Sequence, residues 1–200
     1  LTTTPDHGPT TGGTVVSGTL DDDPTFTVVA VSAGRYHSLA LGDDGNAYAW
    51  GSGSNGTLGT GNGSSATVPG LVHAPGGVTF TAISAGGYHS LALGDDGQTY
   101  AWGYGLGGML GTGNNSSSLV PVPVSTPAGV TFTAISAGNS HSLALGDDGH
   151  AYAWGSGTNC TLGTGNSSSA VVPTLVIAPV GVTFTAISGG NGHSLALADD

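Results

Sequence analysis

The chain is 200 residues long, the length of one ordinary domain, and has 38 glycines and 12 acidic residues against one basic residue. It has no Glu or Lys and very little Arg, Gln or Met, which argues against a helical bundle, a coiled coil or a helix-rich fold. The formal net charge of −11 excludes binding to nucleic acids and to anionic membrane surfaces, because both need clustered cations.

The short apolar runs, the start of the chain and its one cysteine further limit the class of protein. The longest apolar runs, such as residues 28–31, are too short to span a bilayer. The chain shows no secretory signal and begins with Leu1 rather than Met, so we expect a mature or excised piece of a protein. Cys160 stands alone, which excludes an internal disulfide framework and a cysteine zinc cage.

Residues 1–25 are expected to form an N-terminal extension. Within it, the string P-D-H-G-P-T-T-G-G-T-V-V at residues 5–16 resembles the opening strand of an immunoglobulin-like TIG domain. A lone strand cannot form a sandwich, so this segment is expected either to pair with another element or to remain flexible. The aspartates at 21–23 are interpreted as a solvated loop, with cation binding as the alternative.

From Ser32 onward the sequence repeats with a period of 52 residues. The string S-A-G-x-x-H-S-L-A-L-G-D-D-G-x-x-Y-A-W-G begins at Ser32, Ser84 and Ser136, and the shorter string S-G-G-N-G-H-S-L-A-L-A-D-D begins at Ser188. No insertion interrupts the spacing, so each copy is expected to occupy an equivalent structural position.

Each copy predicts four short strands, which in the second copy lie at residues 79–83, 89–93, 99–102 and 119–124. Alternating Phe, Thr and Ile in the first of them suit a half-buried pleated surface. The string G-D-D-G between the second and third strands is typical of a hairpin turn. Pro121 and Pro123 cannot donate to a strand ladder, so the fourth strand is expected at the edge of its sheet.

Four strands in about 40–50 residues, repeated along a chain, are typical of β-propeller blades, which bury their faces by stacking on one another. We therefore predict an all-β fold of four-stranded antiparallel blades; a parallel β-helix is the alternative, although its coils are usually shorter. The expected blades are residues 26–79, 80–131 and 132–183, with a half blade at 184–200. The expected filling between blades is Phe80, Ile83, Leu91, Leu93, Tyr100 and Trp102, with the equivalent residues of the other copies.

The strings S-A-G-x-x-H-S-L-A-L-x-x-D-G-x-x-Y-x-W-G and L-G-T-G resemble the repeats of the regulator of chromosome condensation family, over residues 26–200. Members of that family fold as seven-bladed propellers, so the resemblance implies the same kind of blade here. The loop after the third strand departs from the family pattern. Thr57, Met109 and Thr161 stand there in place of the usual Gln.

The founding eukaryotic member of the family binds chromatin and exchanges nucleotide on a small GTPase. The net charge of this chain opposes that function, so it is not carried over. Bacterial relatives are extracellular or surface proteins, and one is a propeller-shaped β-lactamase inhibitor. The near-identical, cation-poor copies resemble this bacterial group, so the resemblance implies an extracellular or cell-surface location.

Three and a half blades do not close a ring of seven. The chain is then a fragment of a longer protein, half of a ring made by two copies, or a subunit of a head-to-tail filament. In the last two cases, a strand donated by the N-terminal extension would complete the half blade of a neighbour. The residues expected to donate it are Gly12, Gly13, Thr14, Val15 and Val16.

His37, His89, His141 and His193 recur once per copy. We interpret them as structural, with ring nitrogens bonded to nearby backbone groups, because equivalent residues of successive blades lie too far apart to share a metal ion. The Asp-Asp pairs are interpreted as turn residues; calcium is the alternative, but two adjacent carboxylates supply too few oxygens. No metal or cofactor is expected.

No catalytic site is expected either. Ser follows His in every copy, but successive strand residues point to opposite faces, and no nucleophile elbow or phosphate loop is present. Asn-x-Ser/Thr sequons in the loop after the third strand would permit N-glycosylation of an exposed rim, although Asn and Ser are also ordinary loop residues. The sequons begin at Asn55, Asn62, Asn114, Asn115, Asn159 and Asn166.

Two functions from different classes remain. The first is a structural module that assembles with copies of itself, which near-identical, charge-poor repeats and an incomplete last blade favour. The alternative is a module of the adhesin or inhibitor type that binds a protein or a glycan. The variable dipeptide before each repeated His favours it, and aromatic and arginine side chains often anchor such surfaces. The candidate interaction residues are Arg35, Tyr36, Tyr88, Tyr104, Asn139 and Asn191.

Overall fold

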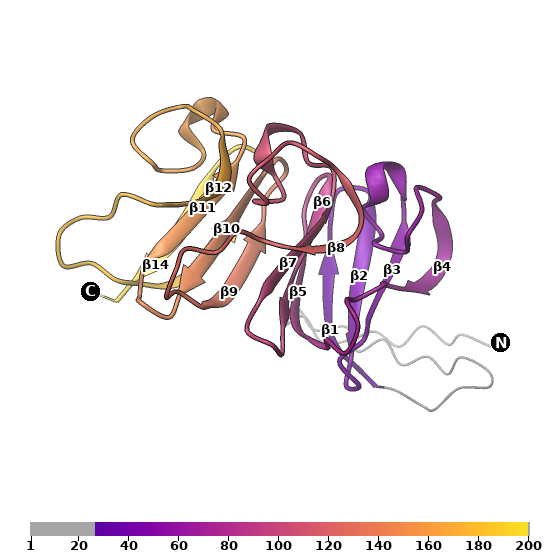
Figure 1. Ribbon diagram of the computed structural model, residues 1–200. Coiled ribbons are helices and arrows are strands. Elements are labelled where there is room, and N and C mark those ends of the chain that lie inside the picture. Colours follow the sequence, from indigo (N-terminus) through magenta and orange to yellow (C-terminus); the bar gives the residue numbers. More distant parts are fainter. Residues whose placement is uncertain (1–26, 200) are drawn as a thin grey trace, which may run out of the picture.

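The computed structural model describes residues 27–199, which form four antiparallel sheets in succession (Figure 1). The first sheet contains β1 (Val28–Ala33), β2 (His37–Gly42), β3 (Ala47–Gly51) and β4 (Ala66–Leu71). The second contains β5 (Phe80–Ala85), β6 (His89–Gly94), β7 (Thr99–Gly103) and β8 (Ser118–Pro123). The third contains β9 (Phe132–Ala137), β10 (His141–Gly146), β11 (Ala151–Gly155) and β12 (Ala170–Leu175). The fourth contains β13 (Phe184–Gly189) and β14 (Ser194–Ala198).

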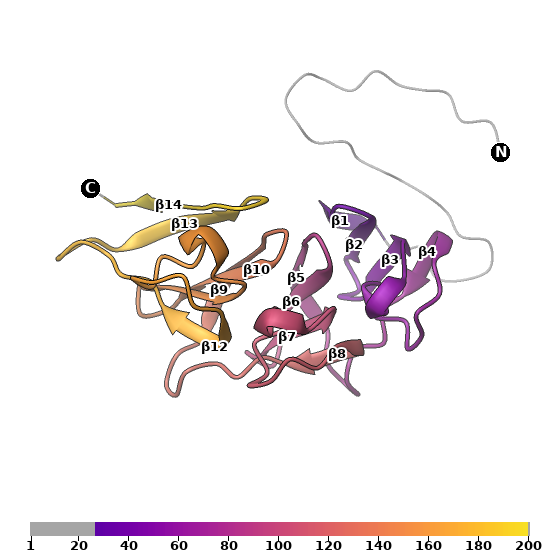
Figure 2. The ribbon, with the colours of Figure 1, turned by 90° about the horizontal axis from the view of Figure 1, so that it is seen from above.

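Within each sheet, every strand pairs with the next strand in the chain. The first strands of successive sheets are neighbours along the inner side of an arc, and β4, β8 and β12 form its outer edge (Figure 2). Pro121 and Pro123 lie in or at the end of such an edge strand, as their missing donors predict. The prediction of an all-β fold of propeller blades, three and a half of them, is confirmed. The short 3-10 helices η1 (Ser54–Gly56), η2 (Leu106–Gly108) and η3 (Thr158–Cys160) follow the third strands.

The central hairpin has the same register in every complete sheet. In the second sheet His89 faces Gly103, and the equivalent pairs of the first and third sheets share this alignment. A hydrogen bond from the Gly97 amide to the Gly94 carbonyl closes the turn, and Gly97 takes a φ of +78°, which residues with a side chain rarely adopt. The copies of the repeat therefore build the same local structure.

The core lies between the sheets. Side chains alternate across a strand, so each sheet has two faces, and the leucine-rich face of one packs on the aromatic face of the next. The first junction buries Leu39, Leu41 and Leu58 against Phe80, Tyr100 and Trp102. The second buries Leu91, Leu93 and Leu110 against Phe132, Tyr152 and Trp154. The predicted filling is thus confirmed at these junctions, with Ile83 only partly buried.

At each end of the arc, one sheet face of a kind that is buried at the internal junctions is exposed. Leu195 and Leu197 of the last sheet are 63% and 64% exposed, although their equivalents in the second sheet are buried. Val31 of the first sheet is 56% exposed. The predicted filling is wrong for these end residues, because no further sheet packs against them within residues 27–199.

Three sequence-based expectations concern other parts of the chain. The donated strand at residues 12–16, the TIG-like segment at 5–16 and the aspartates at 21–23 lie outside the described residues. Among residues 27–199, no helix has the length and apolar character needed to cross a membrane.

The glycine-rich loop after β7 brings backbone close to a tryptophan. Gly111 has a φ of +67°, and a β-carbon added there would lie 2.7 Å from Nε1 of Trp154. Gly111→Ala is expected to lower the free energy of unfolding by about 2–4 kcal/mol, since backbone strain and overpacking add. Gly113 has a φ of +86° with no atom within 4 Å of the added carbon. Gly113→Ala should lower the free energy of unfolding by the backbone strain alone, about 1–2 kcal/mol. Urea unfolding compares the two, and equal losses would contradict the close approach.

Candidate functional site

The connecting loops lie at two opposite ends of the strands. The loops after the first and third strands of each sheet form one end, which we call the loop face. A hydrogen bond of 2.8 Å from the Ser52 amide to the Tyr36 carbonyl joins these two kinds of loop. The hairpin turns after the second strands form the other end, which we call the turn face.

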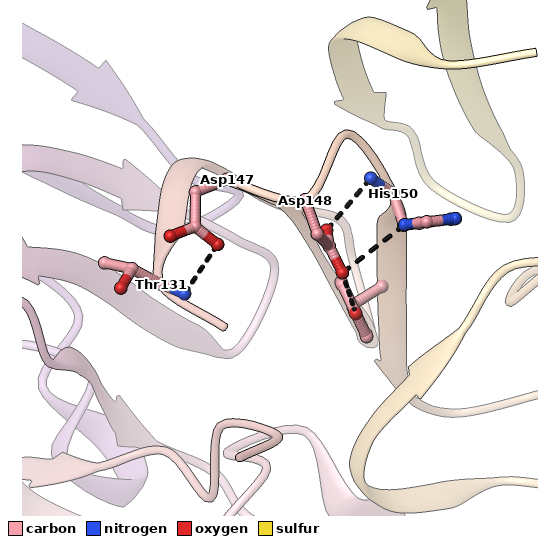
Figure 3. Close-up of polar contacts among 5 residues, drawn as sticks. Thr131, Asp147, Asp148 and His150 are labelled. Atoms are coloured by element: carbon pink, nitrogen blue, oxygen red, sulfur yellow. Dashed lines mark hydrogen bonds and ion pairs between the residues drawn. The ribbon is translucent and has the colours of Figure 1, made fainter. Parts of the chain in front are cut away.

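On the turn face, the paired aspartates are bonded within their own sheet. Asp147 accepts a hydrogen bond of 3.0 Å from the Thr131 amide, and Asp148 accepts one of 3.0 Å from the His150 amide (Figure 3). The Tyr152 hydroxyl donates to Asp148 at 2.6 Å. Partial burial raises the pKa of Asp148, but these bonds and the nearby imidazole of His150 outweigh it and lower the pKa. Burial, followed by the bond to Asp148, raises the pKa of Tyr152 to about 12.

The same turn bonding recurs in other sheets, where Asp43 and Asp95 accept from the amides of Thr27 and Thr79. These contacts are the ordinary capping role of aspartate in turns. Within residues 27–199, no three His, Cys, Asp or Glu side chains lie close enough together to hold a metal ion.

A chain of hydrogen bonds, which we call the histidine–serine relay, crosses each junction between sheets; it is buried at the first two junctions and partly buried at the third. Nε2 of His37 lies 2.8 Å from Oγ of Ser90 in the next sheet, and that hydroxyl donates to the Thr57 carbonyl at 2.9 Å. Because the Ser90 hydroxyl donates its only proton to that carbonyl, its oxygen must accept a hydrogen bond from His37, which therefore carries its proton on Nε2. The equivalent pairs, at 2.8 and 3.0 Å, are His89–Ser142 and His141–Ser194.

Burial keeps the relay histidines neutral. It lowers the pKa of His37 to about 4 and, together with the neighbouring His37 and His141, that of His89 to about 3. Nδ1 of both rings has no hydrogen-bond partner within the described residues, and a proton there would be an unpaired buried donor. The expectation of backbone partners for the ring nitrogens is therefore wrong: the observed partner is a serine side chain of the next sheet. The repeated H-S dipeptide places both members of the pair in every copy, but it does not show that they meet across neighbouring sheets.

The relay also fixes the tryptophans. The Thr57 carbonyl that accepts from Ser90 accepts a second hydrogen bond, of 2.9 Å, from Nε1 of Trp102. At the second junction, the Met109 carbonyl likewise accepts hydrogen bonds from the Ser142 hydroxyl and from Nε1 of Trp154. Because a main-chain carbonyl accepts both bonds, Thr and Met can each occupy this position.

The relay does not form a catalytic pair. His89, Ser90 and Ser142 are fully buried, so a substrate has no access to them. The serine hydroxyl donates to a carbonyl rather than to the imidazole, so the imidazole is not placed to remove the serine proton.

On the loop face, side chains of the first two sheets form one cluster, the arginine–tyrosine patch (Arg35, Tyr36, Tyr88 and Tyr104). The Arg35 guanidinium carbon lies 4.9 Å from the ring centroid of Tyr36 and 5.8 Å from that of Tyr88. Nη1 of Arg35 donates to the Tyr88 hydroxyl at 3.1 Å. The Tyr88 ring lies 6.1 Å from Tyr36 and 6.3 Å from Tyr104. Beside Tyr36 and Tyr88 runs a groove of about 320 Å³, lined also by Ser52 and Asn55.

The other two candidate interaction residues lie further round the arc, in the third and fourth sheets. Asn139 and Asn191 line, with Arg35, a shallow hollow of about 520 Å³ at the inner rim of the loop face. The Arg35 amide donates to the Gly86 carbonyl of the next sheet, and equivalent bonds follow along the arc. The backbone of these loops is therefore held in place while the side chains differ between sheets.

The six sequon asparagines are all exposed in the loops after the third strands. The side chains of Asn62, Asn114 and Asn166 each accept a hydrogen bond from the amide two residues on, an ordinary turn role. N-glycosylation of these loops stays a prediction.

Comparison with known proteins accounts for the repeat. The model of the regulator of chromosome condensation (RCC1) repeat matches residues 44–93, 96–145 and 148–197. The chain belongs to the RCC1 repeat family. It is 32% identical to the ultraviolet-B receptor UVR8 of Arabidopsis thaliana, over 88% of this chain and 40% of UVR8. It is also 32% identical to the mitochondrial RCC1 domain-containing protein RUG3 of that plant, over 96% of this chain and 45% of RUG3.

Among solved structures, the RCC1-like sheets resemble Prp20p from Saccharomyces cerevisiae, which has been studied for its binding to Gsp1p and histones. The TM-score is 0.77 and the identity 25%, over 86% of this chain and 43% of Prp20p. The chain thus has an RCC1-like propeller fold and spans less than half the length of these relatives.

These relatives overturn the expected extracellular or cell-surface location. RUG3 is mitochondrial, and Prp20p binds histones, which points away from the outside of the cell. The expectation was wrong because it depended on a likeness in composition to bacterial surface proteins. Charge and composition bear on solubility and binding, and they do not determine a compartment.

The relay makes the stability of the protein depend on pH. Unfolded histidines bind a proton near pH 6.5, whereas folded His37 and His89 do so only near pH 4 and pH 3. The free energy of unfolding is therefore expected to be highest above pH 6.5 and to fall as the pH drops from there towards pH 4. Each buried histidine contributes up to about 1.4 kcal/mol per pH unit. Urea unfolding from about pH 7.5 to about pH 5 measures this, and a flat profile would contradict it.

A matched pair of histidines tests the relay directly. His89→Ala removes a buried ring and its bond to Ser142, so the free energy of unfolding is expected to fall by about 3 kcal/mol. His193 has the same position in its repeat but is exposed at the end of the arc. His193→Ala should therefore change the value by less than about 0.5 kcal/mol. Thermal and urea unfolding at low protein concentration compare the two variants, and similar losses would refute the assigned role.

Proposed function

We propose that this chain is a non-catalytic, protein-binding segment of an RCC1-type propeller and that its loop face is the binding surface. The arginine–tyrosine patch carries the proposal. It gathers three tyrosines and the chain's only arginine, and these residue types are enriched at the centres of protein interfaces. Tyr36 is 53% exposed.

Comparison within the repeat supports the same surface. The dipeptide before the repeated histidine is Arg-Tyr, Gly-Tyr, Asn-Ser and Asn-Gly in successive copies, although the residues around it are nearly the same. Tyr104 stands where the first and third copies have Ser52 and Ser156. The aromatic side chains are therefore features of one place on the loop face rather than of the repeat. Among the relatives, Prp20p binds the proteins Gsp1p and histones, and UVR8 is a receptor.

Site-specific photocrosslinking tests this proposal. A photoreactive amino acid is placed at Tyr36 on the loop face and, in a matched variant, at exposed Gln98 on the turn face. After irradiation in an extract of the source cells, discrete protein adducts are expected from position 36 and not from position 98. Adducts of equal intensity from both positions, or from position 98 alone, would contradict the proposal.

Self-association is a second candidate, favoured by the two uncovered ends of the arc. The last sheet presents exposed leucines, Leu195 and Leu197, of the kind that cover an aromatic face at each internal junction. Its exposed His193 and the partly exposed Ser38 of the first sheet are at the positions that the relay pairs elsewhere. A head-to-tail contact between copies would join these groups and give a ring or a filament.

The oligomeric state of the chain tests this second candidate. Sedimentation of the unmodified chain is expected to show mass increasing with protein concentration, because apolar sheet faces at both ends become buried. Leu195→Asp should abolish the increase, whereas Val68→Asp, at an exposed position of the outer strand β4, should not. A monomer at all concentrations, or equal effects of the two substitutions, would contradict head-to-tail association.

A further inference from the structure

The charges of the described residues are separated along the strand direction. Six aspartates of residues 27–199 lie in the hairpin turns of the turn face, at positions 43, 44, 95, 96, 147 and 148, and Asp199 directly follows β14 at the same end of the strands. Arg35 lies on the loop face, at the opposite end of the strands. No carboxylate of residues 27–199 forms an ion pair with it. The patch is thus a cationic point on a face that has no carboxylate of its own within the described range.

The guanidinium of Arg35 is held in place by its surroundings. It lies near the faces of two tyrosine rings, Tyr36 and Tyr88, and donates to the Tyr88 hydroxyl at 3.1 Å. Its own amide is fixed by a bond of 3.2 Å to the Gly86 carbonyl. A guanidinium has several N–H donors, and only the one on Tyr88 is used within residues 27–199. Because the side chain is already ordered, a ligand that takes the remaining donors loses less entropy on binding.

The chemistry of this point favours a single carboxylate. A planar guanidinium matches the two oxygens of a carboxylate, with two parallel hydrogen bonds. Phosphate-rich polymers need several cations, and the chain offers one arginine against a net charge of −11. The adjoining groove is lined by tyrosine rings and by the small polar residues Ser52 and Asn55, which suits an apolar side chain and a peptide backbone.

We propose that the arginine–tyrosine patch binds a protein partner through one aspartate or glutamate side chain, which pairs with Arg35. An apolar side chain next to that residue in the partner lies in the groove beside Tyr36 and Tyr88. This inference rests on the proposed function of the loop face, and it adds the chemical class of the partner.

The test uses the full chain and an array of synthetic peptides. Each peptide carries one Asp or Glu flanked by apolar residues, and each has a twin in which Asn or Gln replaces the acid. The acidic peptides are expected to bind at least tenfold more tightly than their twins. Arg35→Gln should remove this difference, whereas Gln98→Ala, at an exposed position of the turn face, should preserve it. Circular dichroism confirms that both variants are folded.

The outcomes separate this inference from the proposed function. If the twins bind as tightly as the acidic peptides and Tyr36→Ala abolishes the binding of both, the carboxylate proposal is overturned but the loop face remains the binding surface. If binding is unchanged in both Arg35→Gln and Tyr36→Ala, both proposals are overturned. If peptides carrying phosphoserine bind tenfold more tightly than the acidic ones, or if no peptide binds, the carboxylate proposal is overturned.

Discussion

The histidine–serine relay is the interaction on which the arrangement of the sheets depends. Each histidine–serine bond joins residues 53 positions apart in the chain, one repeat plus one residue, so it sets how each sheet sits on the next. The carbonyl at its end also receives the indole of the next tryptophan, which couples the polar contact to the packing of the largest buried side chains. A proton added to a buried Nδ1 would be a charged donor without a partner, which weakens this network. The relay therefore gives the core both its alignment and its sensitivity to acid.

Much of the fold could be predicted from the sequence because short local patterns of residues indicate its strands and turns. The alternating residues of each copy indicate strands, G-D-D-G indicates the hairpin, and Pro121 indicates an outer edge. The relay could not be predicted in the same way. His37 and Ser38 are neighbours in the sequence, and nothing in that pairing shows that the imidazole meets Ser90 of the next sheet. The exposed state of Leu195 was missed for a related reason, since a repeat predicts equivalent residues but not whether a neighbour covers them.

The candidate site shows the same division between local and non-local information. Arg35 and Tyr104 differ from their counterparts in the other copies, and Tyr36 and Tyr88, which are counterparts of each other, differ from those of the third and fourth copies. Equivalent loops of adjacent sheets bring these four residues together. The stacking of the guanidinium near two rings depends on the angle between sheets, which the sequence does not contain. Asn139 and Asn191 stand at equally variable positions but lie elsewhere on the rim, so variation alone does not define a site.

The separation of charge described for residues 27–199 has a physical consequence for how the protein meets other molecules. Carboxylates at one end of the strands and a guanidinium at the other give this part of the molecule an electric dipole along the strand direction. In the field of an approaching macromolecule, such a dipole applies a torque before any contact forms, and steering of this kind raises the rate of productive encounters. A positively charged surface would attract the acidic end of residues 27–199 and repel the end that carries Arg35. The direction of this dipole within residues 27–199 thus depends on where seven aspartates and one arginine lie along the strands rather than on the net charge.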